Sequence, residues 1–166
     1  MSIVINGISV PYSGERIKKD EFRSNFMITS VVLPEQIKEI DDYAFFNCQC
    51  LESVEMSNSL MRIGMKAFDG CVSLKSVRIP KGVKVIETSF SGCEELKSVF
   101  IPEGVIKIDL CAFFWCGKLE SVNIPNSVIE IGDNAFGECP HLIIKCKKDS
   151  YAHKYAIANN LKFQLI

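Results

Sequence analysis

Apolar and polar positions follow a pattern that repeats along almost the whole chain. A phenylalanine recurs at intervals of 23, 23, 22, 23 and 23 residues, and an isoleucine stands four or five residues before each one. These phenylalanines are Phe22, Phe45, Phe68, Phe90, Phe113 and Phe136. Self-similarity at a fixed period of about 20 to 50 residues is typical of units that cannot bury an apolar face alone and must stack on their neighbours. The pattern therefore predicts a repeat solenoid in which the phenylalanines and the isoleucines form continuous buried columns.

Within each unit the spacing of apolar residues predicts two short strands and one turn. The first segment has an L-x-x-V-x-I pattern, as in Leu119, Val122 and Ile124, and its later part alternates like a strand. Proline follows in most units and ends the strand because it has no amide hydrogen to donate; Ser57 is an exception. A second short apolar segment comes next, and the motif A-F-x-x-C that follows suits a single helical or 3₁₀ turn. We therefore expect each unit to make one circuit of strand, turn, second strand and short helical turn.

A single domain, residues 1–166, accounts for the chain. Residues 1–29 are predicted to be an N-terminal cap with a degenerate first repeat, residues 30–143 five repeats of 22 or 23 residues, and residues 144–166 a C-terminal cap. The repeat that contains Phe90 is one residue shorter than the others, which predicts a local irregularity at that level rather than a break.

Both ends depart from the repeat. The first unit keeps Ile8 and Val10 in register with the inward positions of later units but lacks the full apolar set, as expected of a cap whose outer side faces water. In the C-terminal cap, Asp149 or Ser150 is expected to begin a short helix, and residues 162–166 alternate like a final strand. This cap should close the apolar end of the stack.

Composition and charge exclude several classes of function. The 166 residues are 48% hydrophobic and 23% charged, which is an ordinary globular balance. A net charge of -1 provides no general attraction to nucleic acid or to anionic lipid, so we expect no nucleic-acid binding. The apolar runs are far shorter than the roughly 18 residues of a membrane span, so we expect no membrane insertion. Residues 1–6 lack the basic start and long apolar core of a signal peptide, which predicts a cytoplasmic location for the chain as given.

Cysteines and catalytic motifs give no sign of chemistry. Five of the eight cysteines share one repeat position, where we expect a buried column of small apolar side chains: Cys48, Cys71, Cys93, Cys116 and Cys139. Zinc would need four convergent ligands, but only Cys48 and Cys50 are closely spaced and no histidine is near them in sequence. No recognised catalytic or dinucleotide-binding motif is present. The sequence therefore predicts no metal, no cofactor and no enzymatic activity.

The repeat resembles a known family. The pattern I-P-x-x-V-x-x-I-x-x-x-A-F-x-x-C-x-x-L, seen in residues 124–142, is similar to the BspA-like (treponemal type) leucine-rich repeats, and the resemblance extends from about residue 7 to Ala156. It implies a right-handed β/α superhelix with parallel strands. It also implies a noncatalytic binding module, because members of the family are often surface or secreted proteins linked to adhesion to host proteins, matrix proteins or other cells.

The variable positions of the repeat indicate where a protein partner could bind. One outward column of the predicted sheet is not uniform and contains Glu55, Arg78, Phe100 and Asn123; of these, Arg78 and Phe100 are the strongest candidates because arginine and aromatic residues are enriched in binding hot spots. The alternative is that this face is only solvated. A second candidate is Phe114 with Trp115, together with Phe46, since other repeats do without aromatic residues there. These rings could instead pack against a neighbouring turn.

Two functional hypotheses follow. The first is a noncatalytic protein–protein interaction module, adhesin-like by its resemblance, that binds through the exposed face of its parallel sheet and whose family places it at the cell surface or outside the cell. The alternative is a structural or self-assembling repeat protein. The oligomeric state expected is a monomer or a weak homo-oligomer.

Overall fold

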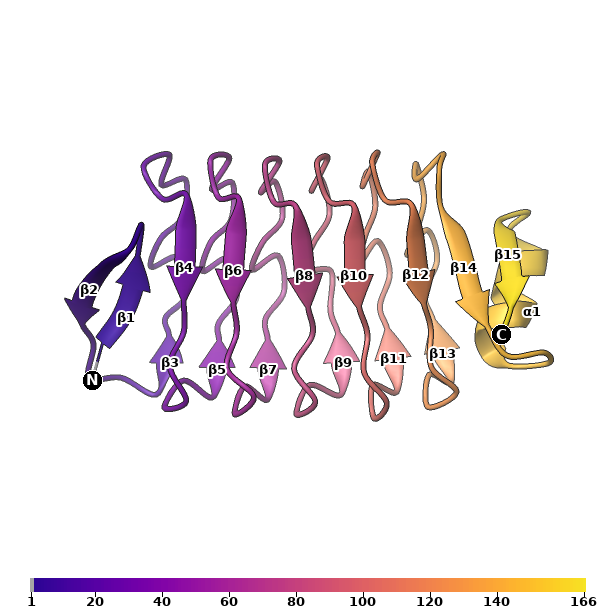
Figure 1. Cartoon of the computed structure of the whole chain (residues 1–166), viewed down its shortest axis with the longest axis horizontal. Coiled ribbons are helices and arrows are strands. Elements are labelled where there is room, and N and C mark those ends of the chain that lie inside the picture. The colour runs from indigo at the N-terminus through magenta and orange to yellow at the C-terminus, as the bar shows by residue number, and fades with distance from the viewer. Residues whose placement is uncertain (1) are drawn as a thin grey trace.

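The computed structural model describes residues 2–166 and shows a solenoid of stacked coils (Figure 1). Each coil from the second to the sixth contributes one strand to a front row and a two-residue strand to a second row behind it. The front row consists of β4 (Ser30–Val32), β6 (Ser53–Glu55), β8 (Ser76–Arg78), β10 (Ser98–Phe100), β12 (Ser121–Asn123) and β14 (Ile143–Cys146). The second row consists of β3 (Arg16–Ile17), β5 (Glu39–Ile40), β7 (Arg62–Ile63), β9 (Val85–Ile86), β11 (Lys107–Ile108) and β13 (Glu130–Ile131). Paired strands within each row are parallel and place like residue on like, as the repeat predicts.

The phenylalanine column forms the centre of the solenoid. Successive rings from Phe22 to Phe136 lie 5.1 to 5.5 Å apart between centroids and are close to parallel. Five of the six rings are fully buried, and Phe22, in the first coil, is partly buried. The isoleucines of the second row are buried beside them. The predicted buried columns are thus confirmed, and no ring is left in a separate pocket.

The segment around each phenylalanine is a run of turns, in which the predicted short turn takes the form of isolated 3₁₀-type hydrogen bonds rather than a continuous helix. In the second coil the amides of Tyr43, Phe45 and Asn47 donate to carbonyls of the next coil, at 2.9, 2.8 and 2.7 Å. The amides between them donate three residues back, as Phe46 does to Tyr43. A helix would direct every amide along its own turn. Because alternate amides point along the solenoid axis instead, neighbouring coils are hydrogen-bonded through the turns as well as through the strands.

The N-terminal end is closed by a hairpin that the repeat register does not predict. Strands β1 (Ser2–Ile5) and β2 (Ile8–Pro11) are antiparallel, and β1 lies beside β4. Asn6 and Gly7 have φ of 51° and 77°, as a two-residue hairpin turn requires. The expected inward register of Ile8 and Val10 is therefore wrong: Ile8 is 68% exposed, whereas Ile3 on β1 is buried against the core.

The C-terminal cap has the predicted helix and strand. Helix α1 (Tyr151–Ala158) begins after Ser150, whose hydroxyl oxygen accepts the amide hydrogen of His153 at 3.2 Å. Strand β15 (Lys162–Leu165) extends the front row beside β14. The Tyr155 ring meets Phe136 edge to face, with centroids 6.4 Å apart. The helix thereby covers the last ring of the phenylalanine column.

The irregularity predicted for the shorter repeat lies between the third and fourth coils. Within residues 2–166, β6 is not paired with β8, and β7 is not paired with β9. The core continues through this level, because Phe68 and Phe90 still stack at 5.4 Å. The turns also stay bonded, since Phe68 donates its amide hydrogen to the Ser89 carbonyl at 2.9 Å. A circuit that is one residue short keeps its phenylalanine in column, but neither of its strands is in hydrogen-bonding register with the preceding coil.

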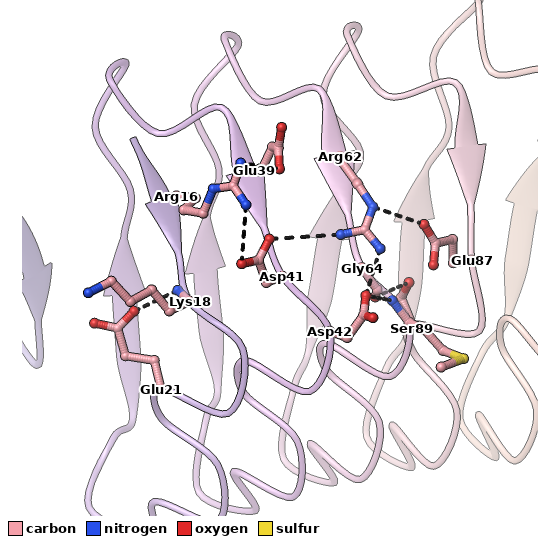
Figure 2. A network of polar contacts seen from close by, with 11 residues as sticks. Arg16, Lys18, Glu21, Glu39, Asp41, Asp42, Arg62, Gly64, Glu87 and Ser89 are labelled. Carbon is pink, nitrogen blue, oxygen red and sulfur yellow. Dashed lines mark hydrogen bonds and ion pairs between the residues drawn. The ribbon is translucent and has the colours of Figure 1, made fainter. Parts of the chain in front are cut away.

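Arg62 bridges this interruption on the second row (Figure 2). Its guanidinium lies 2.6 Å from the carboxylate of Asp42 in the preceding coil and 3.3 Å from that of Glu87 in the following coil. Burial alone would raise the pKa of Asp42, but the hydrogen bonds from Arg62 and from the Met65 amide outweigh it, so the pKa of Asp42 is lowered. An ion pair thus joins β7 to the coil with which it has no strand pairing.

Candidate binding surface

The front row presents an outward face that is divided between β6 and β8. In each three-residue strand the middle valine is buried, and the residues on either side of it reach solvent to varying degrees. Strand register aligns the serines at the start of the strands into one row. The third positions form a second row, in which Phe100 is paired with Arg78 on one side and Asn123 on the other. The column predicted from sequence is therefore a spatial row, although Glu55 lies across the gap between β6 and β8.

Arg78 and Phe100 form a cation–π pair on this face. The guanidinium carbon lies 4.2 Å from the centroid of the ring, and Phe100 is 47% exposed. Such a contact at an exposed site contributes roughly 0.5–1 kcal/mol, which is enough to favour one orientation of a long side chain. Within residues 2–166 Arg78 makes no ion pair or side-chain hydrogen bond, so its donors stay available. The pair presents a cation and an apolar ring that the scaffold does not need.

The second predicted site divides into two separate places. Phe114 and Trp115, in the turns between β11 and β12, stack with centroids 5.8 Å apart, and Trp115 is 58% exposed. Phe46 belongs to the second coil, where the guanidinium of Arg23 lies 4.8 Å from its ring centroid. Phe46 therefore packs with a neighbouring turn and is not part of the same patch as Trp115.

A cavity of about 390 Å³ next to Trp115 was not predicted. It is lined by residues of three successive coils: Glu94, Glu95, Trp115, Gly117, Lys118, Glu138 and Pro140. The repeat alignment holds the signal for it, because Trp115 occupies the column of Gly70 and Gly92. All three residues have positive φ, between 58° and 74°, a region that glycine tolerates and that is costly for a bulky side chain.

The column of cysteines is buried, as the sequence predicts. Each thiol donates to the carbonyl oxygen of the phenylalanine in the preceding coil, as Cys71 does to Phe45 at 3.2 Å and Cys93 to Phe68 at 3.3 Å. Burial raises the pKa of Cys71 and of Cys93 well above the ordinary value of a thiol. These groups therefore stay protonated and act as small packing residues. Among residues 2–166 no group of three or more His, Cys, Asp or Glu side chains is arranged to hold a metal ion.

Comparisons with known proteins agree with this architecture. A family model described as BspA type leucine rich repeat region matches residues 15–143 in six copies. Among solved structures, a leucine rich cell surface protein from Faecalibacterium prausnitzii is 30% identical, with a TM-score of 0.63 over 91% of this chain and 47% of that one. A leucine rich repeat protein from T. pallidum is 33% identical, with a TM-score of 0.65 over 70% of this chain and 58% of that one. The chain thus spans about half the length of these relatives.

Two further comparisons give no information about this chain beyond its fold. The pneumococcal vaccine antigen PcpA, at 20% identity and a TM-score of 0.62, covers 81% of this chain and 34% of its own and shares the fold alone. A search of curated proteins gave no match. Within the described residues, no helix has the length and apolar character that crossing a membrane requires.

Proposed function

The chain belongs to the family of BspA-type leucine-rich repeat regions, and from that premise we propose that it is a noncatalytic module that binds a protein partner through the exposed face of its front row. The observation that carries the proposal is the Arg78–Phe100 pair, at 4.2 Å, on the outward face of the front row, next to the row of serines. The partner we expect presents a carboxylate to the free donors of Arg78 and an apolar group to Phe100.

An adhesin-like role at a cell surface is part of this proposal. It is supported by the relative from Faecalibacterium prausnitzii, which is described as a leucine rich cell surface protein. A stack of coils offers a long and rigid wall to a partner, and repeat proteins typically bind through such extended surfaces.

The test compares capture of partners by the intact chain, by the double variant Arg78→Ala with Phe100→Ala, and by a control variant. The control is Lys84→Ala with Ile129→Ala, which also removes one exposed cation and one exposed apolar side chain but lies outside the front row. Proteins from the native organism and from cells it contacts are cross-linked to each bait and quantified. We expect a partner that the intact chain and the control retain and that the double variant loses at least tenfold. If the double variant captures every partner as well as the intact chain does, the face is assigned wrongly.

A second candidate function is self-assembly, which the exposed edge strands favour. All four residues of β2 and of β15 are exposed, including Ile8 and Phe163. Strand β2 runs in the same direction as β4, so β15 of one copy could pair in parallel with β2 of another and add coils end to end. Light scattering over a concentration series tests this candidate, because a persistent monomer up to millimolar concentration contradicts it.

A further inference from the structure

The cavity beside Trp115 is shaped by missing side chains. Gly117 stands between Glu94 and Pro140 in its column, and a Cβ atom built on Gly117 would meet nothing within 4 Å. A Cβ atom on Gly137 would lie 2.9 Å from the Phe114 ring, so only glycine leaves room for that ring above the next coil. Phe114 in turn stacks on Trp115. Glycines thus keep the hollow open and position the two aromatic rings at its edge.

The conformation and the exposure of Trp115 are unfavourable in free energy. Its backbone has φ of 58°, and its indole is 58% exposed although burial of the ring would be favourable. Neither the fold nor the core therefore accounts for a tryptophan here. Of all side chains tryptophan offers the best aromatic face for a cation, and it is among the most enriched residues in binding hot spots.

The charge of the lining decides which ligand fits. Three carboxylates, of Glu94, Glu95 and Glu138, line the cavity with a single cation, Lys118. Lys118 donates to both oxygens of Glu95, at 2.6 and 2.8 Å, and these hydrogen bonds lower the pKa of Glu95. Glu94 and Glu138 make no ion pair within residues 2–166 and are exposed. Two negative charges therefore stay uncompensated beside an open indole.

We propose that this cavity binds a cationic side chain, an arginine or a lysine on a basic segment of a protein partner, by placing it against the face of Trp115 between Glu94 and Glu138. The volume of about 390 Å³ is ample for one such side chain. A cation in this position gains both the indole face and the two free carboxylates, whereas a neutral or acidic group gains at most one of them. The site lies outside the front-row face of Arg78 and Phe100 and is a second point of contact.

The experiment uses the fluorescence of Trp115, which is the single tryptophan of the chain. The intact chain is titrated at low salt with a synthetic Gly-Arg-Gly-Arg-Gly amide and with the same peptide carrying citrulline, which has the shape of arginine but no charge. We expect saturable quenching by the arginine peptide, at least tenfold weaker binding of the citrulline peptide, and weakening by 0.5 M NaCl. Calorimetric titration of Trp115→Leu should show a loss on the order of tenfold.

A matched pair of variants separates a built site from general attraction to acidic residues. Glu94→Gln with Glu138→Gln should weaken the arginine peptide at least tenfold, whereas Glu52→Gln with Glu120→Gln, which removes the same charge elsewhere, should not. Equal binding of the citrulline peptide, equal weakening by both pairs, or tighter binding of a neutral oligosaccharide than of the arginine peptide overturns the proposal. Arg78→Ala with Phe100→Ala should leave the titration unchanged, so this site and the front-row face can fail independently.

Discussion

Replacing Phe113 by alanine removes one ring from the middle of the stacked column. Phe113 is fully buried and lies 5.5 Å from Phe90 and 5.4 Å from Phe136, measured between centroids. Truncation of a buried phenylalanine typically costs about 3–5 kcal/mol, and each lost aromatic contact accounts for roughly 0.5–1.5 kcal/mol within that range. Because the column is continuous and the coils cannot easily collapse onto one missing ring, we expect a loss of about 4 kcal/mol in the free energy of unfolding.

Phe100→Ala is the matched control, since it removes the same group from the same coil on the outside of the solenoid. Phe100 is 47% exposed and its ring contacts the Arg78 guanidinium, so we expect a loss of no more than about 1 kcal/mol. Urea unfolding followed by far-ultraviolet circular dichroism gives both values. Hydrogen exchange should show faster opening of the fourth to sixth coils in Phe113→Ala than of the first two, because repeats couple mainly to their neighbours. Equal losses in the two variants would refute the idea of a single buried column.

Three other predictions concern the coils and their contacts. The pKa of Asp42 is lower in the folded state, so its carboxylate stabilises the fold above the unfolded pKa of about 3.9, and this contribution is lost as the pH falls through the folded pKa. Asp42→Asn should therefore lower the free energy of unfolding by up to about 1 kcal/mol at pH 7 and make it less sensitive to acid, which urea midpoints at pH 7 and pH 3 would show. Titration of the native protein with a thiol reagent should label the exposed Cys50 rapidly and the partly buried Cys111 more slowly. The other six cysteines are buried and should react only after unfolding, so prompt labelling of Cys93 would contradict the packing. Gly132→Ala should lower the free energy of unfolding by about 1–3 kcal/mol, because its Cβ would collide with the backbone nitrogen of Leu110. The matched variant Gly117→Ala meets no atom within 4 Å and should leave the melting temperature unchanged.

Part of the candidate site can be predicted from the sequence. The row of Glu55, Arg78, Phe100 and Asn123 follows from the repeat register, since residues one period apart must lie on neighbouring strands. The 4.2 Å contact of Arg78 with Phe100 does not follow, because it depends on the orientation of a long side chain. The assignment of this row as a binding surface, and the division of the chain at residues 29 and 143, stay predictions. The cavity at Trp115 could have been suspected from a tryptophan in a column that holds glycine in the two preceding repeats, Gly70 and Gly92.

The sequence by itself determined the solenoid, its buried columns, the parallel pairing of like residues and the C-terminal helix after Ser150. These features depend on spacing, and a period of 22 or 23 residues with one phenylalanine per unit has only one way to bury that ring on its neighbours. The Asn6-Gly7 hairpin was also encoded locally, because that dipeptide favours a two-residue turn, but the register of the repeat obscured it.

Only the tertiary structure decided the turns, the interruption between the third and fourth coils and the Trp115 cavity. An amide in the turn around Phe45 can bond within its own coil or to the next one, and the choice depends on where the carbonyl of Ala67 lies after stacking. The gap beside Arg62 likewise arises from how a shorter coil fits between longer ones. Spacing along a chain fixes which residues share a column, whereas the hydrogen bonds and hollows between columns depend on distances that exist only once the coils are stacked.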